Sequence, residues 1–224
     1  MNGTSTQLLC LITGPSGSGK TSIALGLEKL VRAYTDSVTD SPNITGSGGT
    51  KHTAVILLHQ DNYFVKPFLP YKQRKDDSYE NNSGIDWDRL MSDIHCHISK
   101  HPASIIIVEG HLLGDASAVF FGNFAGCCNI LAVMITCSTE CCKYRRLQRR
   151  PRSDDERHEL TTYIDNFVLP SFLKYGVGAM QAMRDLVVSK GCNLMEVDSD
   201  HTIMNTIVDE IWKKINELYD IGGK

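Results

Sequence analysis

The sequence predicts an α/β fold in which a mainly parallel central sheet is flanked by helices, and two observations indicate it. Short apolar runs alternate with longer segments of helical periodicity along the chain, as in βαβ units. The first apolar run is followed by Gly14-Pro15-Ser16-Gly17-Ser18-Gly19-Lys20-Thr21, the G-x-x-x-x-G-K-[ST] spacing of a phosphate-binding loop. Such a loop binds phosphate between a strand and a helix N-terminus. The alternative, a Gly/Ser-rich loop without a ligand, is disfavoured because strand, full spacing and helix occur together.

Five apolar runs are predicted to be strands, and periodic segments between them are predicted to be helices. The predicted strands cover residues 7–12, 54–58, 104–108, 130–135 and 193–197. The predicted helices cover residues 21–31, 87–97, 140–150, 160–186 with an interruption near Pro170, and 202–218. Segment 35–53 is rich in Ser, Thr, Gly and Asp and is expected to be a flexible surface insertion, whereas 66–84 is polar with little periodicity.

Length and composition favour an ordinary globular protein. A mass of 24.9 kDa with 42% hydrophobic and 22% charged residues fits a single domain over 1–224 with a sizeable core. The net charge of -3 gives no reason to expect a nucleic-acid partner. The N-terminus lacks the pattern of a secretory signal, and no window is apolar enough to span a membrane. We therefore expect a cytoplasmic protein without nucleic-acid or membrane partners.

The eight cysteines are scattered and show no C-x-x-C spacing of a zinc or redox site. Several fall in apolar stretches, where a reduced cysteine behaves as a small hydrophobic residue. Free thiols are therefore favoured over a metal site or a disulfide.

Each position of the phosphate-binding loop has a physical role. Its glycines let the backbone turn tightly and direct N–H groups at an anion. Lys20 would place a positive charge at the β- and γ-phosphates, and the Thr21 hydroxyl is a suitable Mg²⁺ ligand. The residues expected to bind the nucleotide are Gly14, Ser16, Gly17, Ser18, Gly19, Lys20, Thr21 and Ser22.

Two carboxylates follow the ends of predicted strands. Asp61 lies just past the strand at 54–58 and is suited to accept a proton from a hydroxyl, the alternative being a capping or turn aspartate. Glu109 ends the apolar run at 105–108 and resembles a Walker-B group that holds Mg²⁺, the alternative being a solvent-facing carboxylate. Ligands of open parallel sheets bind beyond the carboxyl ends of the strands. We therefore expect the phosphate loop, Asp61 and Glu109 to share one crevice.

A basic segment follows the fourth predicted strand. Six cations fall in one ten-residue window: Lys143, Arg145, Arg146, Arg149, Arg150 and Arg152. Arginines on a lid over a triphosphate neutralise charge that develops in the transition state. The alternatives are a solvated charge run or a nucleic-acid patch, which the acidic net charge disfavours.

Three segments give the chain a resemblance to the nicotinamide riboside kinase branch of the uridine kinase-like P-loop kinases. They are Gln60-Asp61-Asn62-Tyr63-Phe64-Val65-Lys66-Pro67, Ile107-Val108-Glu109-Gly110-His111-Leu112-Leu113 and Val168-Leu169-Pro170-Ser171-Phe172-Leu173-Lys174-Tyr175. The resemblance covers most of the chain except 35–53. It implies a P-loop NTPase fold of the nucleoside/nucleotide kinase type, with about five parallel strands and an arginine-rich lid at about 140–160.

The resemblance also implies roles for individual residues. Asp61 would contact the ribose 5′-hydroxyl as the base, Phe64 would line the nucleoside pocket, and Tyr79-Glu80 would hold the ribose hydroxyls. Thr21 and Glu109 would bind the metal, and the catalytic set would be Asp61 and Lys20 with lid arginines Arg145 and Arg149. Arg146, also in the lid, would contact the substrate.

The chain departs from the family pattern at several positions. Asn62 replaces a second aspartate, Val65 is inserted, and Glu80 is one methylene longer than the expected aspartate. Pro151 stands near the position of an aromatic residue that would stack on the base. The residues that would replace this aromatic side chain are Tyr63, Phe64, Tyr79 and Tyr163.

The resulting hypothesis is ATP- and Mg²⁺-dependent phosphorylation of a ribonucleoside 5′-hydroxyl, with nicotinamide riboside favoured and uridine or cytidine as the nearest alternatives. The expected partners are a small-molecule ribonucleoside and ATP, with adenine weakly indicated near Val197-Asp198. A P-loop regulatory protein without a small-molecule acceptor is a second hypothesis, against which no Asn-Lys-x-Asp guanine-reading motif is present. An RNA-binding surface formed by the arginines is the third.

Overall fold

Five parallel strands form a sheet in the order β2-β3-β1-β4-β5 in the computed structural model, which describes residues 7–39, 54–101 and 103–219. The strands are β1 (Gln7–Thr13), β2 (Ala54–His59), β3 (Ser104–Glu109), β4 (Asn129–Thr136) and β5 (Asn193–Asp198). This confirms the predicted parallel sheet, with each strand within two residues of its expected bounds. β1 is the central strand, so the loop that follows it emerges at the middle of the carboxyl edge.

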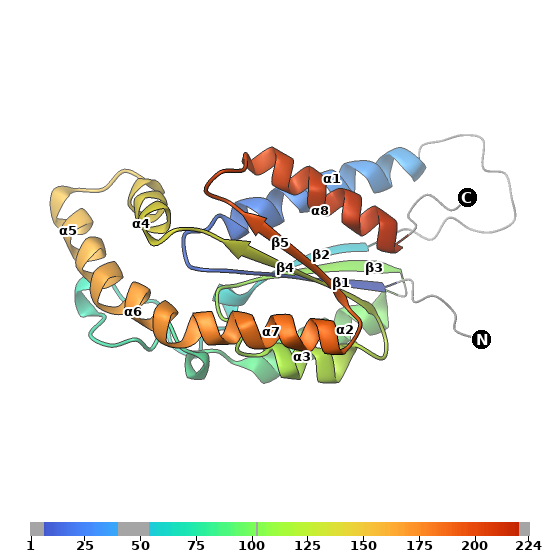
Figure 1. Cartoon of the computed structure of the whole chain (residues 1–224), viewed down its shortest axis with the longest axis horizontal. Helices are drawn as coiled ribbons and strands as arrows, with labels where there is room; N and C mark the ends of the chain where they lie inside the picture. Colours follow the sequence, from blue (N-terminus) through green and yellow to red (C-terminus); the bar gives the residue numbers. More distant parts are fainter. Residues whose placement is uncertain (1–6, 40–53, 102, 220–224) are drawn as a thin grey trace, which may run out of the picture.

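Helices cover both faces of the sheet (Figure 1). One layer consists of α1 (Lys20–Thr39) and α8 (Met204–Tyr219), and the other of α2 (Trp87–Lys100), α3 (Ser117–Phe124) and α7 (Val177–Ser189). Beyond the carboxyl ends of the strands lie α4 (Thr139–Gln148) and α5 (Asp154–Tyr163). The fold is that of a P-loop NTPase of the kinase type.

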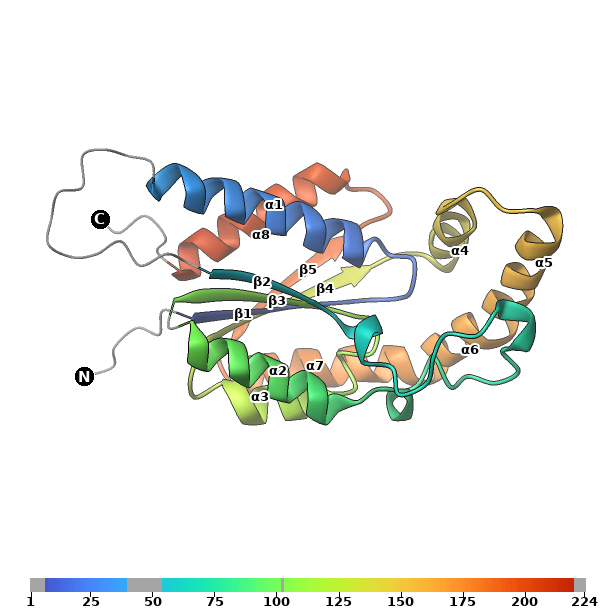
Figure 2. The same ribbon diagram turned by 180° about the vertical axis from the view of Figure 1, so that it is seen from behind.

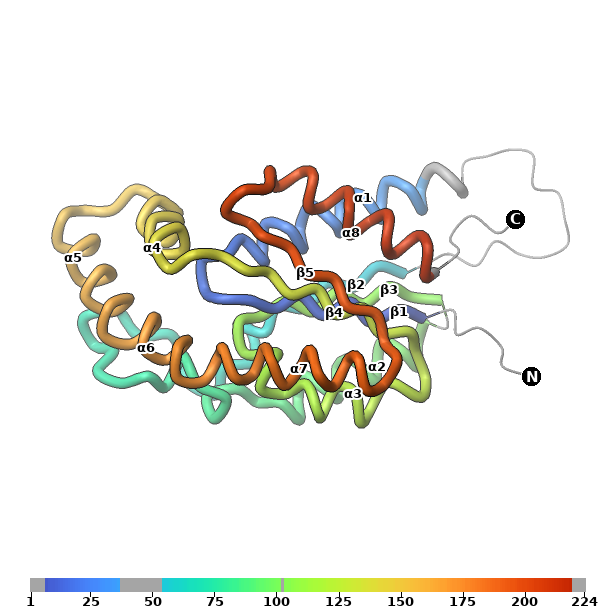
Figure 3. Tube along the Cα trace, in the orientation of Figure 1, coloured from blue at the N-terminus to red at the C-terminus, as the bar shows by residue number. Residues whose placement is uncertain are grey.

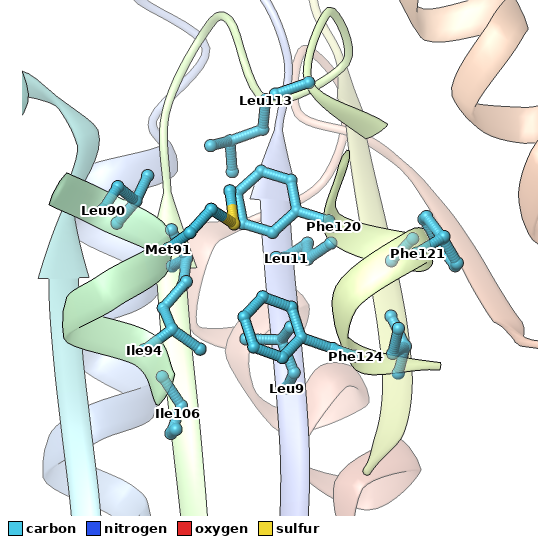
Figure 4. Packing of buried hydrophobic residues seen from close by; sticks show 14 of the residues in the cluster. Leu9, Leu11, Leu90, Met91, Ile94, Ile106, Leu113, Phe120, Phe121 and Phe124 are labelled. Carbon is cyan, nitrogen blue, oxygen red and sulfur yellow. The ribbon is translucent and has the colours of Figure 1, made fainter. Parts of the chain in front are cut away.

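The strand β1 is apolar throughout because both of its faces are buried. Leu9 and Leu11 point into the core under α2 and α3, whereas Leu8, Cys10 and Ile12 pack against α1 and α8. Figure 4 shows the first of these cores, where Phe120 and Phe124 of α3 meet Met91 and Ile94 of α2 over the strands. Two separate cores thus hold the sheet in a fixed register.

Two sequence-based expectations about helices need correction. Residues 35–39 belong to α1, so the insertion predicted for 35–53 does not begin at 35, and its remaining part, 40–53, lies outside the described residues. The short helix α3 was not predicted at all, although Phe120, Phe121 and Phe124 are its buried side chains.

The interruption predicted near Pro170 is not a break in the helix. The chain stays helical from Asp154 to Ser189, and Figure 3 shows α5, α6 and α7 following one another along a bent path. α6 (Leu169–Ser171) contains the proline and is flanked by π-helical segments at Ile164–Val168 and Phe172–Gly176. Wider turns relieve the clash of a proline ring with the preceding turn, so the helix bends and continues.

Seen from behind, the polar segment after β2 lies alongside α5 and α6 beyond the carboxyl edge of the sheet (Figure 2). Its residue Tyr71 packs against a small third core formed by Leu160, Tyr163, Ile164 and Val168. Among the described residues, no helix is long and apolar enough to cross a membrane.

Replacing Phe120 by alanine should destabilise the fold strongly. The side chain is fully buried and meets Trp87 edge-on at 6.2 Å between ring centroids. Phe120→Ala should lower the free energy of unfolding by about 3–5 kcal/mol because it leaves a cavity, which urea denaturation measures. The matched control is Val119→Ala, at a side chain that is 44% exposed. A Phe120→Ala loss no larger than that of the control would contradict the packing described here.

Candidate functional site

The loop after β1 is packed so closely against β4 and α4 that glycine is required at two positions. Gly14 and Gly17 have φ values of 149° and 98°, which L side chains rarely adopt. A Cβ on Gly14 would lie 2.3 Å from the Ile135 carbonyl oxygen, and one on Gly17 would lie 2.5 Å from that of Cys142. The loop is therefore fitted against the start of the arginine-bearing helix.

Lys20, the first residue of α1, is buried and turns back over this loop. Its Nζ donates to the Pro15 carbonyl at 2.9 Å. Burial lowers the pKa of Lys20, and the nearby carboxylates of Glu109 and Asp61 act in the opposite direction. The ammonium group thus lies between the phosphate loop and both predicted acidic residues, where it would attract an anion.

The serines of the loop have different surroundings. Ser16 Oγ accepts a hydrogen bond from Arg146 Nη1. Ser18 Oγ is buried and has no hydrogen-bond partner among the described residues. Ser22 faces a cavity beside the loop, described below.

Thr21 and Glu109 form an oxygen pair at the mouth of the loop. Thr21 Oγ1 donates to Glu109 Oε1 at 3.2 Å, and the same carboxylate oxygen lies 2.8 Å from His59 Nδ1. Two adjacent ligands of an octahedral Mg²⁺ ion are about 3 Å apart, so the spacing and the hard oxygen donors fit this ion. Glu109 is buried, so the solvent-facing alternative does not hold.

Asp61 follows β2 in a short turn of 3₁₀-helix, and its neighbour Gln60 fixes that turn. Gln60 is fully buried and accepts a hydrogen bond from the Leu112 N–H at 2.9 Å. Gly110 leaves room for it, since a Cβ there would lie 2.3 Å from Gln60 Oε1. Asp61 itself is exposed to a cavity and makes no hydrogen bond or ion pair within the described part of the chain. The capping alternative is therefore not observed.

A cavity of about 230 Å³ opens beside Asp61. It brings together predicted substrate residues from three segments, including Phe64, Tyr79, Glu80 and Arg146. The full lining is Ser16, Asp61, Phe64, Phe68, Tyr71, Arg74, Tyr79, Glu80, His111, Arg146, Arg149 and Arg152.

Glu80 is a buried carboxylate in this cavity. Tyr163 Oη donates to its Oε1 at 3.0 Å, and His111 Nε2 lies 3.4 Å from its Oε2. His111 Nε2 also lies 3.2 Å from the Tyr79 carbonyl oxygen, and because both neighbours are acceptors this nitrogen carries a proton. Burial raises the pKa of Glu80, but the His111 hydrogen bond and charge, with smaller contributions from Arg146 and Tyr163, outweigh it and lower the pKa overall.

Arg74, which no sequence pattern singles out, lies in an aromatic cage within the cavity wall. Arg74 Cζ is 4.5 Å from the Tyr71 ring centroid, 4.6 Å from Tyr79, 5.1 Å from Tyr163 and 5.3 Å from Phe68. Its Nε donates to the Leu69 carbonyl at 2.8 Å. These aromatic faces are thus already in contact with a cation, which they bind favourably.

The four aromatic residues named as replacements for the missing stacking residue are placed differently. Phe64 and Tyr79 line the cavity. Tyr63 does not, because it is buried and donates to Asp93 Oδ2 at 2.8 Å. Tyr163 is buried behind Glu80 and does not line it either. Pro151 lies outside the lining as well.

The basic helix α4 directs three arginines at the loop. Arg145 donates to the Ser199 carbonyl at 2.7 Å and to Ser199 Oγ at 3.1 Å. Arg146 binds Ser16 of the loop. Arg149 makes no hydrogen bond or ion pair within the described residues. Arg150 instead pairs with Glu156 at 3.2 Å on the exposed surface.

A second cavity of about 330 Å³ lies on the other side of the loop. Its lining is Gly17, Gly19, Ser22, Arg145, Arg146, Arg149 and Met204. Arg146 and Arg149 line both cavities. Neither Val197 nor Asp198, weakly indicated for adenine, lines the second cavity, and Asp198 Oδ2 lies 2.8 Å from His201 Nδ1.

Comparison with known proteins agrees with this architecture. A family model described as "AAA domain" matches residues 10–164. No curated protein matches the sequence. A gluconokinase from Sinorhizobium meliloti 1021 has a TM-score of 0.54 at 15% identity, over 94% of this chain and 93% of that chain. A candidate kinase from Chloroflexus aurantiacus j-10-fl has a TM-score of 0.49 at 16% identity, over 93% and 98%. A shikimate kinase from Bacteroides thetaiotaomicron has 0.43 at 11% identity, over 95% and 98%. The likeness to the gluconokinase concerns the fold alone.

Gly17→Ala should weaken nucleotide binding. The added Cβ meets the Cys142 carbonyl and demands a left-handed backbone, which costs an L residue about 1–2 kcal/mol or roughly tenfold in affinity. Calorimetric titration with ADP measures the effect. Gly178→Ala is the matched control, because a Cβ there meets nothing within 4 Å. Equal ADP affinity in both variants would contradict the role given to the loop.

Proposed function

The chain belongs to the AAA domain family, and we propose that it is a kinase that transfers the γ-phosphoryl group of ATP to a hydroxyl group of a small molecule. The observation that carries this proposal is the position of Asp61. Its carboxylate faces a cavity of its own, whose wall includes Ser16 of the phosphate loop and the α4 arginines. A nucleotide-binding protein without an acceptor has no use for such a cavity.

In the proposed reaction, Asp61 accepts the proton of the attacking hydroxyl group. Lys20 and the loop N–H groups hold the phosphates, while Arg146 and Arg149, which line both cavities, neutralise charge on the transferred group. Arg145 is held by Ser199 beside the second cavity and would act from that side. Thr21 and Glu109 would hold Mg²⁺, which when bound neutralises charge on the phosphates.

The segment 140–160, with α4 and the start of α5, would serve as the lid over this reaction. It carries Arg145, Arg146 and Arg149 and lies beyond the carboxyl edge of the sheet. Closure over bound ligands would exclude water and so limit hydrolysis of ATP. Arg150, in the turn after α4, pairs with Glu156 of α5 on the outer surface.

The proposed acceptor is the 5′-hydroxyl of a ribonucleoside. Glu80 lines the same cavity as Ser16 of the loop, and one carboxylate can accept hydrogen bonds from two vicinal hydroxyl groups. Phe64 and Tyr79 supply apolar faces for a base. The sequence resemblance favours nicotinamide riboside as the substrate. We also propose that the enzyme is cytoplasmic.

The charges of the cavity favour an uncharged base instead. Nicotinamide riboside carries a fixed positive charge on its pyridinium ring. The cavity wall holds Arg74, Arg146, Arg149 and Arg152 against the carboxylates of Asp61 and Glu80, and Arg74 already lies against Tyr79. Arg74 would repel a second positive charge placed on the Tyr79 ring. Uridine and cytidine are therefore a second candidate pair supported by a specific observation.

ATP consumption across a panel of ribonucleosides separates the remaining hypotheses. A kinase shows consumption that one or more nucleosides accelerate. A P-loop regulatory protein hydrolyses ATP slowly and is unaffected by nucleosides, and RNA binding by the arginines would fall steeply with salt. Acceleration by none of the nucleosides would remove the nucleoside proposal.

Asp61→Asn should lower kcat by about 10²–10⁴, since general-base catalysis contributes that factor. The affinity for ATP should stay largely intact, because Asp61 makes no hydrogen bond with the phosphate loop and acts on Lys20 only through its charge. Coupled ATP-consumption kinetics and ADP titration measure the two quantities. Asp88→Asn, at an exposed aspartate in the first turn of α2, is the control. Turnover by Asp61→Asn equal to that of the control would remove Asp61 as the base.

Wild-type protein should use uridine with a higher kcat/KM than nicotinamide riboside. Arg74→Met should raise the ratio of kcat/KM for nicotinamide riboside to kcat/KM for uridine by about tenfold, because it removes a positive charge from the cavity wall. Arg157→Met, on the exposed face of α5, should leave the ratio unchanged. An unchanged ratio in Arg74→Met, with a folded protein, would show that Arg74 does not select the base.

A further inference from the structure

Two cysteines and an aspartate meet at the junction of β4, α4 and β5, where the proposed kinase reaction does not use them. Cys137 follows β4, Cys141 lies in the first turn of α4, and Asp200 follows β5. Because β4 and β5 are paired parallel strands, their carboxyl ends lie side by side. The Sγ atoms and a carboxylate oxygen of these three residues all lie within 4.8 Å of one another.

The cluster is held in place by its surroundings. Cys137 Sγ donates to Asp200 Oδ1 at 3.0 Å, and Asp200 Oδ2 accepts from the Ser138 backbone N–H at 2.8 Å. All three side chains are partly buried. The neighbouring Cys142 is buried. The carboxylate therefore keeps its orientation toward the two sulfur atoms.

We propose that Cys137, Cys141 and Asp200 bind a zinc ion. Two thiolates and one carboxylate are donors that zinc accepts, whereas magnesium avoids sulfur. Around a tetrahedral zinc ion, sulfur atoms lie about 3.8 Å apart and sulfur and oxygen about 3.5 Å. The three donor atoms, all within 4.8 Å of one another, already lie near these separations. Each thiol would release its proton to solvent as its sulfur binds the metal, and water would fill the fourth position.

Arg145 connects this site with the phosphate loop. Its Nη1 lies 3.6 Å from Cys137 Sγ and also reaches Ser199 Oγ, while Nη2 donates to the Ser199 carbonyl. An N–H group that donates a hydrogen bond to a metal-bound thiolate stabilises that thiolate. Zinc would therefore fix the first turn of α4 and the arginine beside the loop, whether or not the chain phosphorylates a nucleoside.

The full-length protein, reduced and freed of metal with a chelator, tests the proposal. In a titration with zinc chloride, the wild-type protein should bind one more zinc ion per molecule than the Cys137→Ser/Cys141→Ser variant. Cobalt chloride should give a thiolate-to-cobalt charge-transfer band in wild type that the double variant loses. Cys96→Ser/Cys127→Ser, at two exposed cysteines elsewhere, should keep both signals. Asp200→Asn should keep the band and bind zinc more weakly.

A measurement on unaltered protein covers the case in which the double variant does not fold. Zinc should protect Cys137 and Cys141 from alkylation by iodoacetamide, and mass spectrometry of the peptide reports this at each cysteine. Equal zinc stoichiometry in wild type and a folded double variant would overturn the proposal. The proposal would also be overturned if zinc left the alkylation of Cys137 and Cys141 unchanged. Protection caused only by a Cys137–Cys141 disulfide formed in air would overturn it as well.

Discussion

The close contact between the phosphate loop and the β4–α4 segment is the constraint on which the site depends. Gly14 and Gly17 place backbone against the carbonyl groups of Ile135 and Cys142, where no side chain fits. This contact brings α4 to the loop, where Arg145 and Arg146 of its last turn reach Ser18 and Ser16. Because β1 is the central strand, the same loop also reaches the carboxyl ends of β2 and β3. Two acidic residues from those strands thereby come near Lys20.

The polar groups of the site differ in how completely they are satisfied. Glu109 contacts Thr21 and His59, and Glu80 contacts Tyr163 and His111. Buried carboxylates with such partners are held in position. Asp61 differs from both, because it is exposed to the cavity and unpaired within the described chain. Asp61 is therefore suited to accept a proton from a ligand, whereas Glu80 and Glu109 are suited to hold a ligand in place.

Local sequence patterns predicted the strands, the phosphate loop and the acidic residues at strand ends, because each of these is encoded within one short segment. Apart from the short helix α3, the features that escaped prediction join distant segments. Arg74 is caged by rings from 68 to 163, and no short pattern reveals that. Cys137, Cys141 and Asp200 come together through the pairing of β4 with β5, which no local spacing reveals. Pro170 suggested an interrupted helix, whereas π-helical turns on both sides let the helix continue.

The third hydrophobic core has a consequence for how the molecule can change. Leu160, Tyr163, Ile164 and Val168 pack with Tyr71 apart from the two cores against the sheet. One wall of the acceptor cavity is built on that small core, since Tyr71 lines the cavity and Tyr163 holds Glu80. Substitutions there alter the shape of the cavity while the sheet and its phosphate loop keep their packing. Under the proposed function, selection for a new acceptor would act on this wall and leave the phosphate loop unchanged.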